Sequence, residues 1–327
     1  MNRIVRTLGG GLVAVCLGLG LSAAPALAAD LSTDAQAAIP HDVQQLIVID
    51  YRAMQNSPAA TQLKNRLMPP ELKSLEHALQ VSGMNDNHDV DELAFASFRP
   101  QGATGDATRI IGLAQGQFSV DDIMANFKKK HVKPVMLRAN RIYPMGGSGM
   151  QVVFLNPTTM VFGQTDSLKQ ALNARDGMQP NFLSNNTMTD MMASVKNEPL
   201  WSILDQKGTQ TMMRNMMGSA GAAGSQVGDL ETIEKRMLSS WYTLDFNNGV
   251  KFNLDVLTPD TFTAATMASL LNAAALYKKM SGTDIEKQAI DDTTIDSSSG
   301  KLIVTYQSDD QQFATLLHSS LFQSVVH

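Results

Sequence analysis

The stretch Thr159-Met160-Val161-Phe162-Gly163-Gln164-Thr165-Asp166 runs from an apolar strand into a helix start. A second stretch of the same kind stands near the C-terminus, at Lys301-Leu302-Ile303-Val304-Thr305-Tyr306-Gln307-Ser308-Asp309. Each gives an apolar strand, a Gln, a hydroxyl residue and an Asp, and an amphipathic helix pattern follows both. The recurrence predicts that one unit of strands and helices is used twice, with Asp166 and Asp309 at equivalent helix starts.

The strands and helices of the two halves can be matched in the order β-α-β-β-α-β-β-α. The matched strands are Gln45 to Asp50 with Leu200 to Asp205, Leu93 to Phe98 with Ser240 to Phe246, and Thr108 to Gly116 with Val250 to Leu257. Short loops between successive strands favour antiparallel pairing. The sequence therefore predicts an α+β fold of two related units, residues 41–195 and 196–327, with a mostly antiparallel sheet and helices packed on one face.

The N-terminus has the composition of a secretory signal peptide. Arg3 and Arg6 precede a long apolar run, which ends in the small-residue pattern Ala26-Leu27-Ala28. A retained membrane anchor is the alternative, but this pattern favours cleavage after Ala28. We therefore expect a signal peptide over residues 1–28, a polar lead over residues 29–40, and a periplasmic or secreted chain that begins at Ala29.

Composition excludes several kinds of chemistry. The single cysteine of the 327-residue chain is Cys16, which would leave with the signal peptide, so disulfides, zinc thiolates and a thiol nucleophile are not expected. Loss of Arg3 and Arg6 takes the net charge from −5 to −7, which disfavours nucleic acid and anionic membrane surfaces as partners. No second run of 18 or more apolar residues follows, so stable membrane insertion after cleavage is not expected.

Four methionines form the most unusual local pattern. Met212, Met213, Met216 and Met217 precede a Gly/Ala/Ser-rich segment over residues 218–228. Thioethers can bind copper(I), they can fill a core, or they can form an adaptable apolar contact surface. We expect a buried pair and an exposed pair, with a partner protein or an apolar ligand docking on the exposed side.

No residue is assigned a catalytic, cofactor-binding or metal-binding role. No Gly-x-Ser-x-Gly nucleophile elbow occurs, and no glycine-rich loop leads from a strand into a helix. The acidic group of Asp86, His88, Asp89, Asp91 and Glu92 lacks the glycine and the final glutamate of a calcium loop, so a solvated loop is expected there.

A short resemblance adds a fold expectation. The chain has a first strand ending in Asp50, then Val81-Ser82-Gly83-Met84, then His88-Asp89-Val90-Asp91-Glu92-Leu93. In these features, over residues 41 to 175, it resembles exported proteins of Gram-negative soil bacteria that have no assigned activity, which implies a shared fold and no catalytic residue. We expect a non-enzymatic, exported binding or interaction module of the cell envelope. The alternatives are a hydrolase-type enzyme with dispersed catalytic residues and a methionine-based copper(I) binder.

Overall fold

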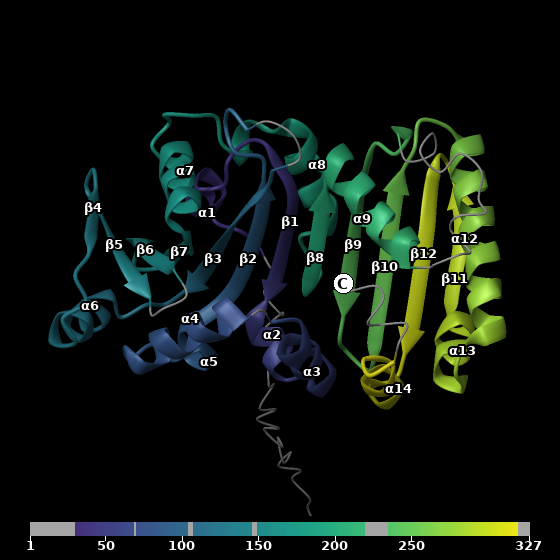
Figure 1. The fold of residues 1–327 in the computed structure, drawn as a ribbon, viewed down its shortest axis with the longest axis horizontal. Helices are drawn as coiled ribbons and strands as arrows, with labels where there is room; N and C mark the ends of the chain where they lie inside the picture. Colours follow the sequence, from purple (N-terminus) through teal and green to yellow (C-terminus); the bar gives the residue numbers. More distant parts are fainter. Residues whose placement is uncertain (1–29, 69, 104–106, 146–148, 220–234, 320–327) are drawn as a thin grey trace, which may run out of the picture.

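All the strands that the structure describes join one antiparallel sheet (Figure 1). The computed structural model describes residues 30–68, 70–103, 107–145, 149–219 and 235–319. The strands are β1 (Val43–Asp50), β2 (Val90–Phe98), β3 (Arg109–Gly116), β4 (Val135–Leu137), β5 (Asn140–Met145), β6 (Met150–Asn156), β7 (Thr159–Gln164), β8 (Leu200–Leu204), β9 (Ser239–Asp245), β10 (Val250–Leu257), β11 (Thr293–Ser298) and β12 (Lys301–Ser308). Their order across the sheet is β11-β12-β10-β9-β8-β1-β2-β3-β7-β6-β5-β4. The expected α+β class and antiparallel sheet are confirmed.

Helices lie against this sheet along its whole width (Figure 1). They are α1 (Thr33–Ala37), α2 (Tyr51–Gln55), α3 (Pro58–Leu67), α4 (Pro70–Val81), α5 (Asp86–Asp89), α6 (Val120–Lys129), α7 (Thr165–Arg175), η2 (Phe182–Ser184), α8 (Asn186–Val195), α9 (Gln206–Ser219), α12 (Thr261–Ser281), α13 (Asp284–Asp291) and α14 (Asp310–Leu316). Within the described ranges, none of these helices combines the length and the apolar content that a membrane span requires.

One face of the sheet, named the α7 face, is closed over the first half by α1, α7 and α8. Leu46 and Val48 of β1 point to this face and are fully buried. Ala35 of α1, Leu168 of α7 and Met188 of α8 belong to the same cluster. Alternate residues of a strand point to opposite faces, so the odd-numbered residues of β1 must be covered from the other side.

The opposite face, named the α3 face, is covered by a second set of helices. In the first half these include α4 and α6, which contribute Leu75 and Phe127. In the second half they include α9 and α12, which contribute Met213 and Met267. The outer strands β10 and β12 therefore carry the expected one-sided helix layer, whereas the strands of the first half are covered on both faces.

The two halves meet where β1 pairs with β8, and the contacts there are reciprocal. The Asp50 N–H donates to the Pro199 carbonyl at 2.7 Å, and the Asp205 N–H donates to the Gln44 carbonyl at 3.0 Å. Each aspartate then caps the helix that follows, because its Oδ1 accepts from the N–H three residues further along at 2.7 Å. Both strands therefore pass into α2 and α9 through the same cap.

Asp166 and Asp309, which the sequence placed at equivalent helix starts, stand in different positions. Asp309 is the N-cap of α14, whereas Asp166 lies in the first turn of α7, whose N-cap is Gln164. Leu168 of α7 belongs to the core of the α7 face, while Phe313 of α14 packs with strand residues of the α3 face. The similarity between the halves is therefore clearest at β1 and β8, and not at these two helices.

The segment that the sequence described as a polar lead is ordered against the core. Leu31, Ala35 and Ile39 are buried, and Ser32 is the N-cap of α1, because its hydroxyl accepts from the Ala35 N–H at 3.2 Å. The small and polar residues around them gave no apolar periodicity, which is why the sequence did not predict this helix.

Candidate functional site

The centre of the α3 face is left partly uncovered. Ile47 and Ile49 point to this face from β1, yet both are only half-buried. Leu93 on the neighbouring β2 is half-buried as well. Central strands normally bury isoleucine and leucine on both sides, so partly uncovered apolar side chains are unusual at this place.

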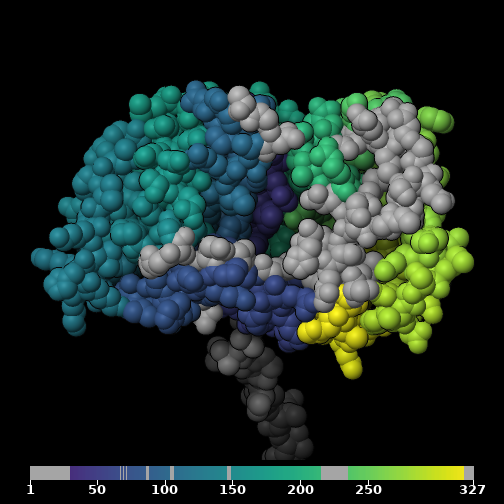
Figure 2. Space-filling view, viewed as in Figure 1, coloured from purple at the N-terminus to yellow at the C-terminus, as the bar shows by residue number. Residues whose placement is uncertain are grey.

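A cavity of about 1390 Å³ lies between these strands and the helices α2, α3 and α4. Figure 2 shows a hollow in the middle of the molecule, with β1 in purple at its bottom. Other apolar residues that line it include Met54, Leu63, Leu72, Leu200 and Leu244. The volume exceeds the range of about 300–1,000 Å³ that is usual for small-molecule pockets. Its size therefore suits a long or branched apolar molecule.

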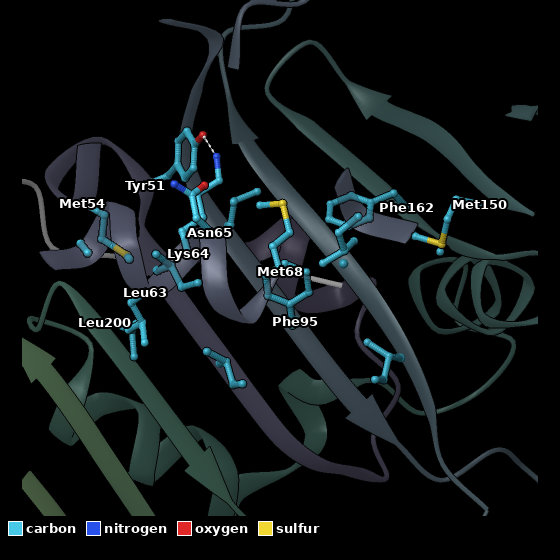
Figure 3. Close-up of a pocket in the computed structure, with 18 of the residues that line it drawn as sticks. Tyr51, Met54, Leu63, Lys64, Asn65, Met68, Phe95, Met150, Phe162 and Leu200 are labelled. Carbon is cyan, nitrogen blue, oxygen red and sulfur yellow. Dashed lines mark hydrogen bonds between the residues drawn. The ribbon is translucent and has the colours of Figure 1, made fainter. Parts of the chain in front are cut away.

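Two aromatic rings line part of the strand wall (Figure 3). Phe95 and Phe162 meet edge to face with ring centroids 6.0 Å apart. Gly112 of β3 is paired with both of them across the sheet. A Cβ atom at residue 112 would lie 2.1 Å from the Phe162 ring, so this ring can lie across β3 only because residue 112 is glycine.

At one end of the cavity, Lys64 of α3 is held in an ion pair. Its Nζ donates to the Tyr51 hydroxyl at 2.6 Å and to Glu76 Oε1 at 2.7 Å, and lies 4.8 Å from the Tyr51 ring centroid (Figure 3). Burial lowers the pKa of Lys64, but the hydrogen bonds to Glu76 and Tyr51 outweigh burial and leave the pKa above its usual value. Lys64 is therefore charged, and its charge is already matched by Glu76.

A second ion pair stands at the β3–α7 end of the cavity. Arg109 Nη1 lies 3.0 Å from Asp166 Oδ2, and both residues line the cavity. The cavity wall between the two ion pairs is made mostly of apolar side chains. The site therefore matches an uncharged apolar molecule, because an anionic group would have to displace Glu76 or Asp166 from its cation.

No protein-family model and no curated protein sequence matches this chain. Among solved structures, the chain is distantly similar to TP0453 of Treponema pallidum. For crystal form I of TP0453 the TM-score is 0.48 at 9% identity, over 88% of this chain and 96% of TP0453. Crystal forms III and IV give TM-scores of 0.48 and 0.46, each at 8% identity. At this level the similarity concerns the α+β fold alone, and no residue of TP0453 is transferred to the cavity.

Of the four methionines that the sequence singled out, Met212 and Met213 have described side chains, and neither lines this cavity. Met213 is buried in a cluster with Met237 and Met267, and Met212 is half-buried against that cluster. The side chains of Met216 and Met217 lie outside the described residues, so the expected split into a buried and an exposed pair is untested. Other methionines, including Met54, Met68 and Met150, line the cavity instead.

The acidic group is divided between a short helix and a strand. His88 and Asp89 end α5, and their side chains lie 3.0 Å apart. Glu92 lies on β2, accepts from the Asp30 N–H at 3.0 Å and from the Gln115 side-chain amide, and burial raises its pKa to about 7. In the described part of the chain, no three His, Cys, Asp or Glu side chains gather as a metal site would require.

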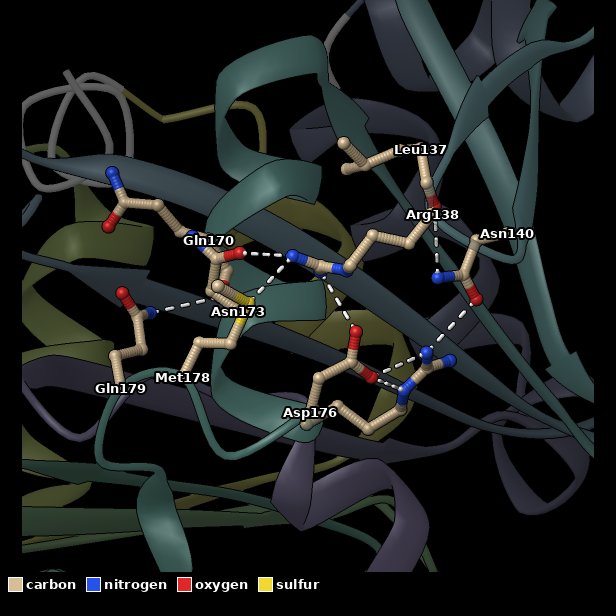
Figure 4. A network of polar contacts seen from close by, with 9 residues as sticks. Leu137, Arg138, Asn140, Gln170, Asn173, Asp176, Met178 and Gln179 are labelled. Carbon is tan, nitrogen blue, oxygen red and sulfur yellow. Dashed lines mark hydrogen bonds and ion pairs between the residues drawn. The ribbon is translucent and has the colours of Figure 1, made fainter.

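A second polar cluster joins the β4–β5 turn to the end of α7 (Figure 4). Arg138 Nη2 lies 2.9 Å from Asp176 Oδ2, and Arg138 Nη1 donates to Asn173 Oδ1 at 2.9 Å. Arg175 Nη2 lies 2.7 Å from Asp176 Oδ1 and donates to Asn140 Oδ1 at 3.0 Å. Because the Asp176 carboxylate pairs with both arginines, we interpret this cluster as a structural contact that holds the β4–β5 hairpin against α7.

Proposed function

We propose that the chain is an exported, non-enzymatic binding protein of the cell envelope that holds an uncharged apolar molecule in the cavity of the α3 face. The observation that carries this proposal is the half-buried state of Ile47 and Ile49 on the central strand β1. A ligand that covered them would complete a core that the helices leave open. Hydrocarbon chains of lipids have the required chemistry and length.

The expected affinity follows from the length of the ligand. Each CH₂ group removed from water contributes about 0.8 kcal/mol, so two further carbons should tighten binding by roughly fifteenfold. The gain should stop when the chain reaches the end of the cavity. Competition by decanol, dodecanol and tetradecanol against the uncharged dye N-phenyl-1-naphthylamine measures this dependence.

A matched pair of variants separates binding in the cavity from adsorption elsewhere. Ile47→Asn places an amide in the cavity wall, whereas Ile303→Asn changes a half-buried isoleucine of β12, which does not line the cavity. We expect Ile47→Asn to weaken dye binding at least tenfold and Ile303→Asn to leave it unchanged. This cavity would be ruled out as the ligand site if the two variants weakened dye binding equally, or if all three alcohols displaced the dye at the same concentration.

We also propose that the two halves descend from one duplicated unit. The reciprocal hydrogen bonds of Asp50 and Asp205 at the β1–β8 junction, and the helix cap that each of them makes, support the proposal. Exchanging the segments around these two aspartates tests it: a chain with residues 47–53 and 202–208 interchanged should still fold. An insoluble product, when single Asp50→Asn and Asp205→Asn variants fold, would contradict it.

A further inference from the structure

Helix α12, at the β11 side of the sheet, has an unusual outward face (Figure 1). Its inner face packs Ala264, Met267 and Ala268 toward the sheet. From Thr261 through Tyr277 the helix contains no charged residue. Surface helices normally place charged residues opposite their buried side, so the outward face of α12 has the composition of a contact surface.

Large apolar residues mark the ends of this outward face. Phe262 is 75% exposed and Met280 is 80% exposed, and Leu276 and Tyr277 are exposed as well. Between these large residues, the outward side chains of α12 are small or polar. The residues of this outward stripe follow one another at alternating steps of four and three residues. The seam consists of Phe262, Thr266, Ser269, Ala273, Leu276 and Met280. These steps average 3.6 residues, the period of the α-helix, so the seam residues form one stripe along the outward side of α12.

The seam is symmetric about its midpoint, and we infer from this that α12 packs antiparallel against α12 of a second copy of the chain. In that register Phe262 of each copy lies opposite Met280 of the other. Leu276 lies opposite Thr266, so a large side chain meets a smaller one. The small residues Ser269 and Ala273 meet at the centre, and Tyr277 beside the seam meets Ala265 in the same register. Two helices that cross come closest in the middle and diverge toward their ends, which fits this order of sizes.

Charge favours a second copy over an anionic membrane as the occupant. The antiparallel arrangement brings Lys278, in the last turn of α12, toward the first turn of the other helix; Lys279 and the N-cap Asp260 already form ion pairs with Asp291 and Arg236 within each chain. Opposed helix dipoles favour the same arrangement. The exposed acidic residue Asp284 of α13 follows directly, and it would oppose an anionic lipid surface. In a two-fold symmetric dimer that meets along this uncharged seam, the negative charges of the two chains stay away from the interface.

Sedimentation velocity over a concentration series tests the inference, on protein expressed from the full sequence and recovered from the exported fraction. The chain should sediment as a dimer, and Leu276→Glu should raise the dimer dissociation constant at least tenfold. The control is Met136→Glu, which changes an exposed residue of β4 at the opposite edge of the sheet. Equal loss in both variants, or a wild-type monomer at every concentration, would overturn the inference. So would a monomer that binds vesicles of phosphatidylethanolamine and phosphatidylglycerol through α12.

Cysteine cross-linking tests the register. A chain with both Phe262→Cys and Met280→Cys should form a covalent dimer under mild oxidation. Each single variant should not, because residues 262 of two antiparallel helices lie roughly 27 Å apart at 1.5 Å per residue. Cross-linking by the single variants at the rate of the double variant would refute the antiparallel register.

Discussion

Gly112→Ala probes the wall of the cavity with a single methyl group. The new Cβ would lie 2.1 Å from the Phe162 ring, and three ring atoms lie within 2.7 Å, so the ring must move away from β3. Overpacking of this kind costs about 1–3 kcal/mol, and the lower chain entropy of alanine in the unfolded state offsets about 0.4–1 kcal/mol. We expect a net loss of about 1–2 kcal/mol in the free energy of unfolding, measured by urea titration.

If the Phe162 ring causes the loss of stability in Gly112→Ala, replacing that ring should abolish the loss. In a Phe162→Leu background, Gly112→Ala should cost less than about 0.5 kcal/mol, which a double-mutant cycle resolves. Dye binding should also weaken in Gly112→Ala, because Phe162 lines the cavity. Additive losses in the double variant would refute the reasoning, since they would show that the methyl group meets something other than the ring.

Three further predictions concern the rest of the molecule. Burial raises the pKa of Glu92 from 4.5 to about 7, so between these pH values the folded state binds more protons than the unfolded state, and the free energy of unfolding should fall as pH rises. Glu92→Gln should remove about 1–2 kcal/mol of this pH dependence, a figure that allows for the partial exposure of Glu92. An unchanged pH profile of stability in Glu92→Gln would contradict this. Met213→Ser should cost about 2–4 kcal/mol in urea unfolding because Met213 is buried, whereas Met212→Ser should cost clearly less; equal losses would show that Met212 also belongs to the core. N-terminal sequencing of the exported protein should begin at Ala29 or within two residues of it, and material that begins at Met1 would remove the export argument.

Local patterns in the sequence predicted much of the sheet. The strand from Gln45 to Asp50 corresponds to β1 (Val43–Asp50), because a short apolar run followed by an aspartate cap carries its own signal. The same holds for β8, which follows Pro199 and leads to Asp205. The segment from Val135 to Tyr143 forms two strands, β4 and the start of β5, because Arg138 adopts a positive φ of 56° at the turn between them.

The cavity could not be predicted from these patterns. Ile47 and Ile49 are ordinary core residue types, and their partial exposure depends on where the helices of the α3 face lie, which local patterns do not determine. Gly112 carries no signal of its own in the sequence, although its lack of a Cβ atom is what leaves room for the Phe162 ring beside β3. The methionine pattern did not indicate which of its members are buried; Met213 packs with Met267 of α12, and the contact surface predicted for the four methionines stays a prediction.

The β1–β8 junction makes any bound molecule a bridge between the two halves of the chain. Leu200 and Leu244 from the second half line the same cavity as Ile47 from the first. Neither half of the chain alone supplies the complete wall of the cavity, so a proteolytic fragment that contains one half would release a bound molecule. Because only the joined halves bind the ligand, a ligand at a hundredfold excess over its dissociation constant would raise the free energy needed to separate the halves by about 2.7 kcal/mol. Loading could thus be read from resistance to proteolysis, with the filled protein outlasting the empty one.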